Sequence, residues 1–319
     1  MRLPHLPQNP HRRRLLKLGG MALIASQTGL LAACSKVLEG SGNTVGTTAA
    51  TGRWTSGGTA MIAKAGQLPN PFDATLGNAC QLTCEATIGP CHTHSVERRD
   101  ISDGWDGLPL CLMLRVLDEN CQPVPDVIVE IWHTNYTGGY SGQIQRMCNN
   151  NQDDLDKQFF RGYQRTDAAG IARFDTCYPG WYRGRAVHIH VRVQTGEYQA
   201  DDHAPASVIT QFLFSDALNQ EIFTGHVLYS GYGQPDTTLD TDNVVGGESD
   251  KSPYILDVQR LDNGVMLASK TLIVRREDGQ PLCRVKGAHG QGGPGGRRGP
   301  PPDGQRPDGP PPDGPPPAH

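Results

Sequence analysis

The sequence has little of what several large classes of protein need. Its apolar run at residues 18–33 holds 16 residues, fewer than the roughly 20 that a helix needs to cross a bilayer. No two cysteines have the Cys-x-x-Cys spacing of many metal clusters, and no long amphipathic helix pattern is present. The formal net charge is −4, which argues against a nucleic-acid partner.

The first 34 residues have the pattern of an exported lipoprotein. Residues 12–17 (Arg-Arg-Arg-Leu-Leu-Lys) precede the apolar run, as in twin-arginine export signals. The run ends in Leu31-Ala32-Ala33-Cys34, which resembles a lipoprotein cleavage box. We therefore predict a signal peptide at residues 1–33, lipidation of Cys34, and anchoring in the cell envelope on the periplasmic side. The alternative is an ordinary export signal followed by an incidental cysteine.

The remaining segments differ sharply in composition. Residues 1–33 carry five basic side chains and no acidic ones, so their removal changes the formal charge from −4 to −9 and leaves acyl chains as the only membrane attachment. Residues 34–74 are rich in Gly, Thr, Ser and Ala and predict a flexible tether. Residues 288–319 repeat Pro-Pro-Pro-Asp-Gly units and predict a disordered tail. One domain remains, at residues 75–287.

Eight cysteines follow Cys34, an even number in a chain predicted to be exported. This favours disulfides for most of them, although eight cysteines allow 105 pairings and the sequence does not choose among these. The eight are Cys80, Cys84, Cys91, Cys111, Cys121, Cys148, Cys177 and Cys283.

The domain is predicted to be all-β, a sandwich with long irregular loops. Short apolar or alternating runs are separated by turns rich in Gly, Pro, Asp and Asn, as is typical of such folds. The predicted strands lie at residues 110–116, 127–132, 171–174, 187–193, 207–214 and 265–274.

One of these strands carries a candidate metal site. His188 and His190 project to the same face of an extended strand, while Ile189 and Val191 face the opposite way, towards a core. The Pro-Gly turn at residues 179–180 can bring the Tyr182 phenol back over the two imidazoles. A second oxygen donor, Tyr140, is available in the Gly-rich segment after residue 132.

The ordered set of motifs resembles the intradiol ring-cleavage dioxygenases, which are non-haem iron(III) enzymes that open catechols between their two hydroxyl groups. The resemblance spans roughly residues 80 to 275. It is carried by Glu130-Ile131-Trp132-His133 with Gly138-Gly139-Tyr140, by Arg165-Thr166-Asp167 through Pro179-Gly180-Trp181-Tyr182 to His188-Ile189-His190, and by Ile209-Thr210-Gln211-Phe212.

The resemblance implies a role for each site residue. Tyr140 and His188 would be equatorial ligands of Fe(3+), with Tyr182 and His190 axial, and no other cofactor is implied. A catechol would chelate the metal, displace Tyr182 and react with O2 to give a muconate-type diacid. Arg185 would stabilise negative charge on the ring, and Gln211 would help to position His or Arg side chains.

One segment departs from the family pattern. The family often has Glu-Gly-Pro-Tyr at the substrate entrance, whereas this chain has Ile88-Gly89-Pro90-Cys91, which leaves the preferred catechol open. A second His-x-His, His92 and His94, is interpreted as a surface loop pair rather than a second metal site. His133 is interpreted as a structural histidine.

Two other functions remain as alternatives. A β-sandwich binding module could hold an aromatic ligand or a metal without turnover, although such a module needs neither Arg185 nor Gln211. A zinc or copper protein could use His188 and His190 alone. Whether the protein forms a homo-oligomer is also left open.

Overall fold

The computed structural model describes residues 53–63, 68–72, 80–145, 147–275 and 283–290. These residues belong to the second of the two units into which the chain divides, residues 48–319. The predicted signal peptide, Cys34 and the tail beyond residue 290 lie outside the described residues. In the described ranges, no helix combines the length and the apolar character needed to cross a membrane.

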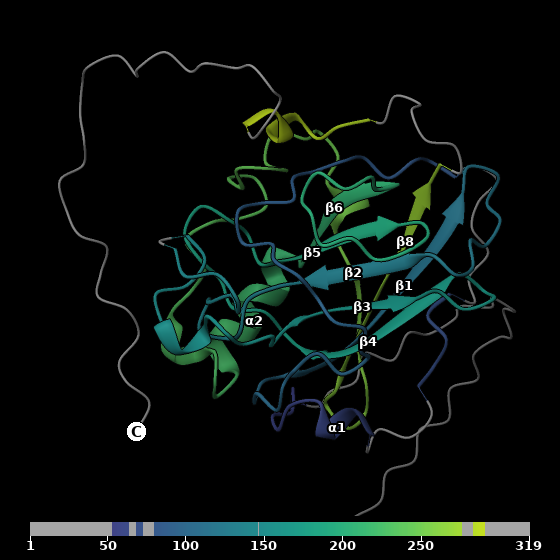
Figure 1. Ribbon diagram of the computed structural model, residues 1–319. Helices are drawn as coiled ribbons and strands as arrows, with labels where there is room; N and C mark the ends of the chain where they lie inside the picture. The colour runs from purple at the N-terminus through teal and green to yellow at the C-terminus, as the bar shows by residue number, and fades with distance from the viewer. Residues whose placement is uncertain (1–52, 64–67, 73–79, 146, 276–282, 291–319) are drawn as a thin grey trace, which may run out of the picture. The chain divides into compact units, whose positions relative to one another are not determined.

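Eight strands form the fold. They are β1 (Pro109–Asp118), β2 (Ile128–Trp132), β3 (Arg161–Arg165), β4 (Ile171–Cys177), β5 (His188–Gln194), β6 (Val208–Leu213), β7 (Asp257–Arg260) and β8 (Met266–Val274). One sheet has the order β4-β1-β8-β7 and the other the order β3-β2-β5-β6, and Figure 1 shows them as two layers. The predicted all-β sandwich is confirmed.

The core between the sheets follows from the alternation of side chains along each strand. In β1, Leu110, Leu112 and Leu114 are fully buried in the central cluster, and from the other sheet Ile189 and Val191 of β5 join the same cluster. Burying one such side chain stabilises the fold by about 1.5–3 kcal/mol. Because successive side chains of a strand point to opposite faces, the polar side chains of β2 and β5 point away from this core.

The sequence pattern does not predict three of the elements, β3, β7 and α2. Strands β3 and β7 consist mostly of polar residues and glycine, so they have no apolar alternation to detect. Helix α2 (Asp216–Gly225) has ten residues and is capped by Ser215, whose side chain accepts a hydrogen bond from the Leu218 nitrogen.

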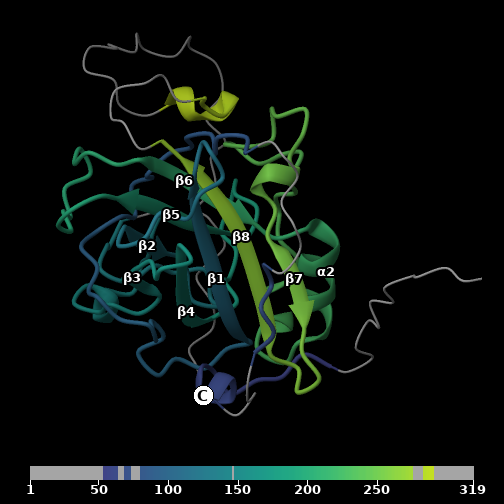
Figure 2. The same ribbon diagram turned by 90° about the vertical axis from the view of Figure 1, so that its right-hand side faces the viewer.

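Figure 2 shows β1 and β8, which pair in parallel, at the middle of their sheet.

Part of the predicted tether lies against the domain. The Thr55 nitrogen donates to the carbonyl oxygen of Gly264 (3.0 Å), and the Gly58 nitrogen donates to that of Gly107 (3.1 Å). Helix α1 (Ala60–Ala63) buries Ile62. The folded part of the chain therefore includes residues 53–63, which the composition had assigned to the tether.

Six of the eight cysteines form disulfides, as predicted for most of them. The pairs are Cys80–Cys121, Cys84–Cys283 and Cys91–Cys148. Cys111 and Cys177 are buried free thiols, and burial raises the pKa of the Cys111 thiol to about 12.

Candidate metal centre

The two histidines of β5 project from the outer face of their sheet, as the strand period predicts. Ile189 and Val191 lie in the sandwich core, whereas His188 and His190 face the opposite way and are nevertheless buried. They are buried because the loops that follow β2 and β4 cover this face. Trp132 of β2 lies directly opposite His190 in the antiparallel pairing, so an indole borders the site.

The two loops that carry Tyr140 and Tyr182 are in close backbone contact. A Cβ atom at Gly138 would lie 2.3 Å from the carbonyl oxygen of Trp181, and Gly138 has a φ of +90°. A Cβ atom at Gly180 would lie 2.6 Å from the Gly138 nitrogen. Only glycine fits such an approach, so the Gly-Gly and Pro-Gly pairs of the sequence set the distance between the two phenols.

Four donor atoms converge at this point. Nε2 of His188 lies 3.1 Å from Nε2 of His190, 3.3 Å from the Tyr182 hydroxyl and 3.4 Å from the Tyr140 hydroxyl. The two hydroxyl oxygens are 3.5 Å apart. Ligands that each lie about 2.0–2.1 Å from one ion are themselves roughly 3–3.5 Å apart. The donor set therefore has the spacing of a single metal site.

Both imidazoles are neutral, which is the protonation state that binds a metal. Nδ1 of His188 lies 2.7 Å from the carbonyl oxygen of Ala186, which can only accept, so Nδ1 carries the hydrogen and Nε2 presents a lone pair. Burial, assisted by the charge of Arg185, lowers the pKa of His188 to about 3. Burial and the neighbouring His188 hold the pKa of His190 well below its ordinary value.

Both phenols are protonated in the absence of a cation. Burial, together with the neighbouring Tyr182, raises the pKa of Tyr140 well above its ordinary value, and burial also raises the pKa of Tyr182. A bound cation lowers such a pKa strongly. Two phenolates and two neutral imidazoles form a hard, anionic donor set that suits a trivalent ion such as iron(III). In the described part of the chain, His, Cys, Asp and Glu alone form no cluster of three that could hold a metal.

Arg185 lies beside the site in a fixed orientation. Its Nε donates to Oδ2 of Asp242 (3.0 Å), and its Nη2 donates to Oε1 of Gln211. Gln211 pairs with His190 across the β5–β6 ladder, and its Nε2 donates to the carbonyl oxygen of Thr87 (2.8 Å). Gln211 therefore connects the arginine to the wall of the site.

Asp242 is a residue that the sequence did not single out, because no motif surrounds it. Burial opposes its ionisation, but the charge of Arg185 and the backbone N–H of Val245 outweigh burial and hold the pKa of Asp242 below its ordinary value. Its two oxygens also accept from the Ala186 and Val244 nitrogens (2.8 and 2.9 Å). The Asp242 carboxylate is thus the buried counter-charge of Arg185.

A cavity of about 280 Å³ opens onto the converging donors, near the lower end of the range typical of small-molecule sites. Two of the four donors, Tyr182 and His190, line it together with Arg185, whereas Tyr140 and His188 are not among its lining residues. The rest of the lining includes Thr87, Gly89, Pro90, Cys91, Met147 and Asn243.

The second His-x-His does not form a site. His92 is buried between carboxylates, with Nε2 3.1 Å from Oε1 of Glu130 and Nδ1 2.5 Å from Oδ1 of Asp202, whereas His94 is exposed. The interpretation of both as a surface loop pair is wrong for His92. One signal was available in the sequence: the alternation of residues 127–132 places Glu130, the partner of His92, on the face that points away from the core.

His133 is a buried histidine with both nitrogens satisfied. Its Nδ1 donates to the carbonyl oxygen of Thr134, and its Nε2 accepts from the Thr176 hydroxyl, both at 2.8 Å. These contacts fit the structural role predicted for it.

Comparisons with known proteins show which proteins this chain is similar to. Residues 86–229 match the model of the Dioxygenase family. The protocatechuate 3,4-dioxygenase beta chain of Burkholderia cepacia is 29% identical over 136 residues, which cover 40% of this chain and 53% of the relative. The intradiol ring-cleavage dioxygenase hqdA of Aspergillus niger is 35% identical over 79 residues, or 24% of this chain and 22% of the relative. The chain thus spans about half of the first curated relative and less of the second.

A solved structure shares the fold. The intradiol ring-cleavage dioxygenase from Tetranychus urticae superposes with a TM-score of 0.53 at 23% identity, covering 64% of this chain and 99% of the other.

Proposed function

We propose that this chain is an intradiol ring-cleavage dioxygenase, a non-haem iron(III) enzyme; the match of residues 86–229 to the Dioxygenase family and the similarity to two curated ring-cleavage dioxygenases support this proposal. It opens the ring of a catecholic compound between the two hydroxyl groups, incorporates both atoms of O2, and forms a muconate-type diacid. The observation that carries the proposal is the convergence of four donors: Nε2 of His188 lies 3.1–3.4 Å from Nε2 of His190 and from both phenol oxygens, which are themselves 3.5 Å apart.

Tyr140, Tyr182, His188 and His190 would hold iron(III), which would act as a Lewis acid for both oxygens of a deprotonated catechol. The two phenols differ in how exposed they are. Tyr140 is fully buried, whereas Tyr182 is partly exposed and lines the cavity. Tyr182 is therefore the phenolate that a catechol can reach, and its oxygen is the base that accepts a substrate proton.

Arg185 supplies positive charge at the cavity wall. Its guanidinium is held by Asp242 and Gln211, so it does not have to reorganise when negative charge develops on the substrate ring. A preorganised charge of this kind stabilises a transition state more than a mobile one does. Gln211 is a positioning residue, because it acts through Arg185.

Export through the twin-arginine route and anchoring by a lipid on Cys34 belong to the same proposal. They rest on the sequence of residues 1–34. The three disulfides support them, since disulfides persist in oxidising compartments such as the periplasm.

The visible spectrum of the iron-loaded protein tests the proposal. A tyrosinate-to-iron(III) band should shift when catechol is added without oxygen and return in air, as muconate absorption grows in the ultraviolet. A coloured protein that binds catechols but forms no product would instead be a binding module. A colourless protein that takes up zinc or copper but no ferric iron would overturn the metal assignment.

A further inference from the structure

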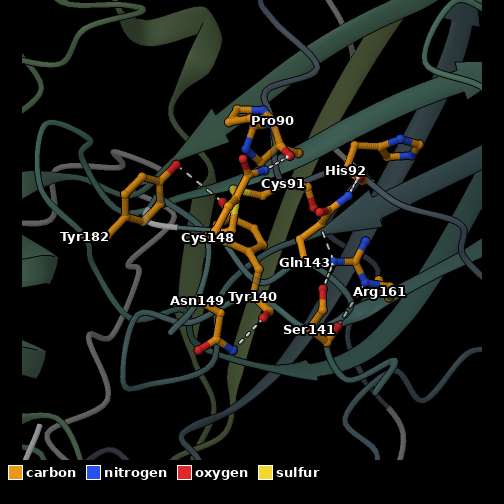
Figure 3. Close-up of a disulfide and its surroundings, with 12 residues drawn as sticks. Pro90, Cys91, His92, Tyr140, Ser141, Gln143, Cys148, Asn149, Arg161 and Tyr182 are labelled. Carbon is orange, nitrogen blue, oxygen red and sulfur yellow. Dashed lines mark hydrogen bonds between the residues drawn. A yellow bond between two sulfur atoms is a disulfide. The ribbon is translucent and has the colours of Figure 1, made fainter. Parts of the chain in front are cut away.

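The Cys91–Cys148 disulfide lies beside Tyr140 and Tyr182, two of the four donors of the candidate metal centre (Figure 3). Both cysteines are buried, in one apolar cluster with Trp132 and Tyr140, and Tyr182 packs against the same cluster. The disulfide joins two segments that meet the centre from different sides, residues 89–91 and the loop between β2 and β3.

On one side, the disulfide holds the backbone of Tyr140. The Tyr140 nitrogen donates to the carbonyl oxygen of Cys148 (2.8 Å), and Nδ2 of Asn149 donates to the carbonyl oxygen of Tyr140 (2.7 Å). Both backbone polar groups of this candidate ligand are therefore bound by the disulfide cysteine or by its neighbour.

On the other side, the disulfide holds the segment that covers His190. A Cβ atom at Gly89 would lie 3.1 Å from Cε1 of His190, so the Gly89 backbone lies directly on that imidazole. Pro90 and Cys91 continue from it along the wall of the cavity. A shift of this segment would move the surface against which His190 is packed.

Hydrogen bonds also join residues 89–91 to the loop between β2 and β3, in addition to the disulfide. Arg161 donates from Nε to the Ser141 hydroxyl (2.9 Å) and from Nη2 to the carbonyl oxygen of Cys91 (3.3 Å). Gln145 donates from Nε2 to the carbonyl oxygen of Pro90 (2.7 Å). The disulfide itself closes the stretch of chain from residue 91 to residue 148, and such a covalent link reduces the conformational entropy lost when the two segments are held together.

We propose that the Cys91–Cys148 disulfide is a positioning element of the metal centre. It fixes the segment that lies on His190 to the loop that carries Tyr140, and so raises the affinity of the four donors for a trivalent ion. This inference rests on the metal centre proposed above.

The test compares two disulfide-free variants of the full chain. C91S/C148S removes the proposed element, and C80S/C121S removes a disulfide that ties residue 80 to the turn after β1. Affinity is measured for ferric iron and for gallium(III), a redox-inert ion of the same charge, by competition with a chelator. C91S/C148S should bind either ion about 10-fold or more weakly, as is typical when the support of a ligand is lost, and its tyrosinate band should shift. C80S/C121S should keep the affinity and the band of the wild type.

Equal affinities in the wild type and both variants would overturn the inference while leaving the metal centre standing. A wild type that binds neither ion would overturn the metal centre itself. The variant C91A/C148V restores apolar contact with Trp132 without a covalent bond. If it binds as tightly as the wild type, packing and not the disulfide positions the centre, and the inference is wrong.

A measurement on the wild type decides the matter if C91S/C148S does not fold. A phosphine reduces a disulfide with water, giving two thiols and a phosphine oxide, and alkylation followed by peptide mapping follows each disulfide separately. Gallium(III) should slow the reduction of Cys91–Cys148 several-fold and leave that of Cys80–Cys121 unchanged, because the bound ion keeps the Tyr140 loop closed. Slowing of both disulfides alike, or of neither, would contradict the proposal.

Discussion

The indole ring of Trp132 lies parallel to the imidazole ring of His190, with ring centroids 4.8 Å apart and planes 8° apart. His92 packs edge-on against the same indole, at 4.7 Å. Trp132 therefore sets the plane of the His190 ring, and with it the direction of the Nε2 lone pair, without offering a donor of its own.

Truncation of Trp132 should weaken both the fold and the metal centre. Trp132→Ala removes a fully buried indole and should cost about 3–5 kcal/mol of unfolding free energy, with a roughly 10–100-fold loss of metal affinity. Trp132→Phe keeps an aromatic ring and removes no hydrogen bond, because Nε1 of Trp132 has no partner among the described residues, so its losses should be much smaller. Denaturant titration and chelator competition measure both effects.

The matched control for Trp132 is Trp54→Phe, a partly buried tryptophan that contacts Glu221 and Arg260 outside the centre. It should leave metal affinity unchanged. Wild-type affinity in Trp132→Ala would show that the stack does not orient His190.

Metal binding should release protons from the two phenols. Burial raises the pKa of both Tyr140 and Tyr182, so each is protonated near neutral pH and loses its proton on binding. Metal affinity should therefore rise with pH, by about 10-fold per pH unit for each proton released. Calorimetry in buffers of different ionisation enthalpy counts these protons. Tyr182→Phe should release one proton fewer than the wild type.

Tyr182→Phe should also lower turnover by about 10²-fold or more, because the variant has no phenol oxygen at this position to accept a proton from the substrate. Tyr136→Phe changes a partly buried tyrosine outside the centre and should alter neither quantity. An unchanged proton count in Tyr182→Phe would remove this phenol from the metal centre.

Loss of the Asp242 carboxylate should harm both stability and catalysis. Asp242→Asn leaves Arg185 buried without its counter-charge, which typically costs about 3–5 kcal/mol. It should also free the guanidinium, so turnover falls while the tyrosinate band stays. Asp236→Asn is the matched control, because Asp236 pairs with the largely exposed Arg183. Wild-type turnover in a folded Asp242→Asn protein would show that this carboxylate does not orient Arg185.

Acid should destabilise the protein through His133. Burial lowers the pKa of His133 to about 4, against about 6.5 in the unfolded chain. The unfolded state therefore takes up a proton first, and stability falls as the pH drops from about 6.5 to 4, by roughly 3 kcal/mol from this residue alone. Denaturant titrations over this range should show a shallower loss in His133→Gln. The exposed His203→Gln should keep the wild-type slope, and equal slopes in all three proteins would contradict the assignment.

Much of the candidate centre was predictable because it is local. The positions of His188 and His190 on one face follow from the period of a strand. The contact between the two tyrosine loops depends on Gly138 and Gly180, which stand in the sequence beside Tyr140 and Tyr182. The sequence predicts the strands β1, β2, β4, β5, β6 and β8 for the same reason, since apolar alternation is a property of neighbouring residues.

Contacts between distant segments could not be predicted in this way. Asp242 lies 57 residues from Arg185, and no pattern near it indicates a buried ion pair. His92 was assigned to the surface because its partners, Glu130 and Asp202, are 38 and 110 residues away. Helix α2 is short, and its burial of Ile222 and Phe223 depends on the sandwich beneath it.

The sequence by itself determined the all-β class, the strands of the core and the four candidate ligands, because alternation and short motifs act over a few residues. The tertiary structure alone decided which cysteines pair, which carboxylate holds Arg185 and which segments enclose His190 and Tyr140. Those choices depend on chain segments that meet only when the two sheets have packed and the loops have closed over the outer face of β5.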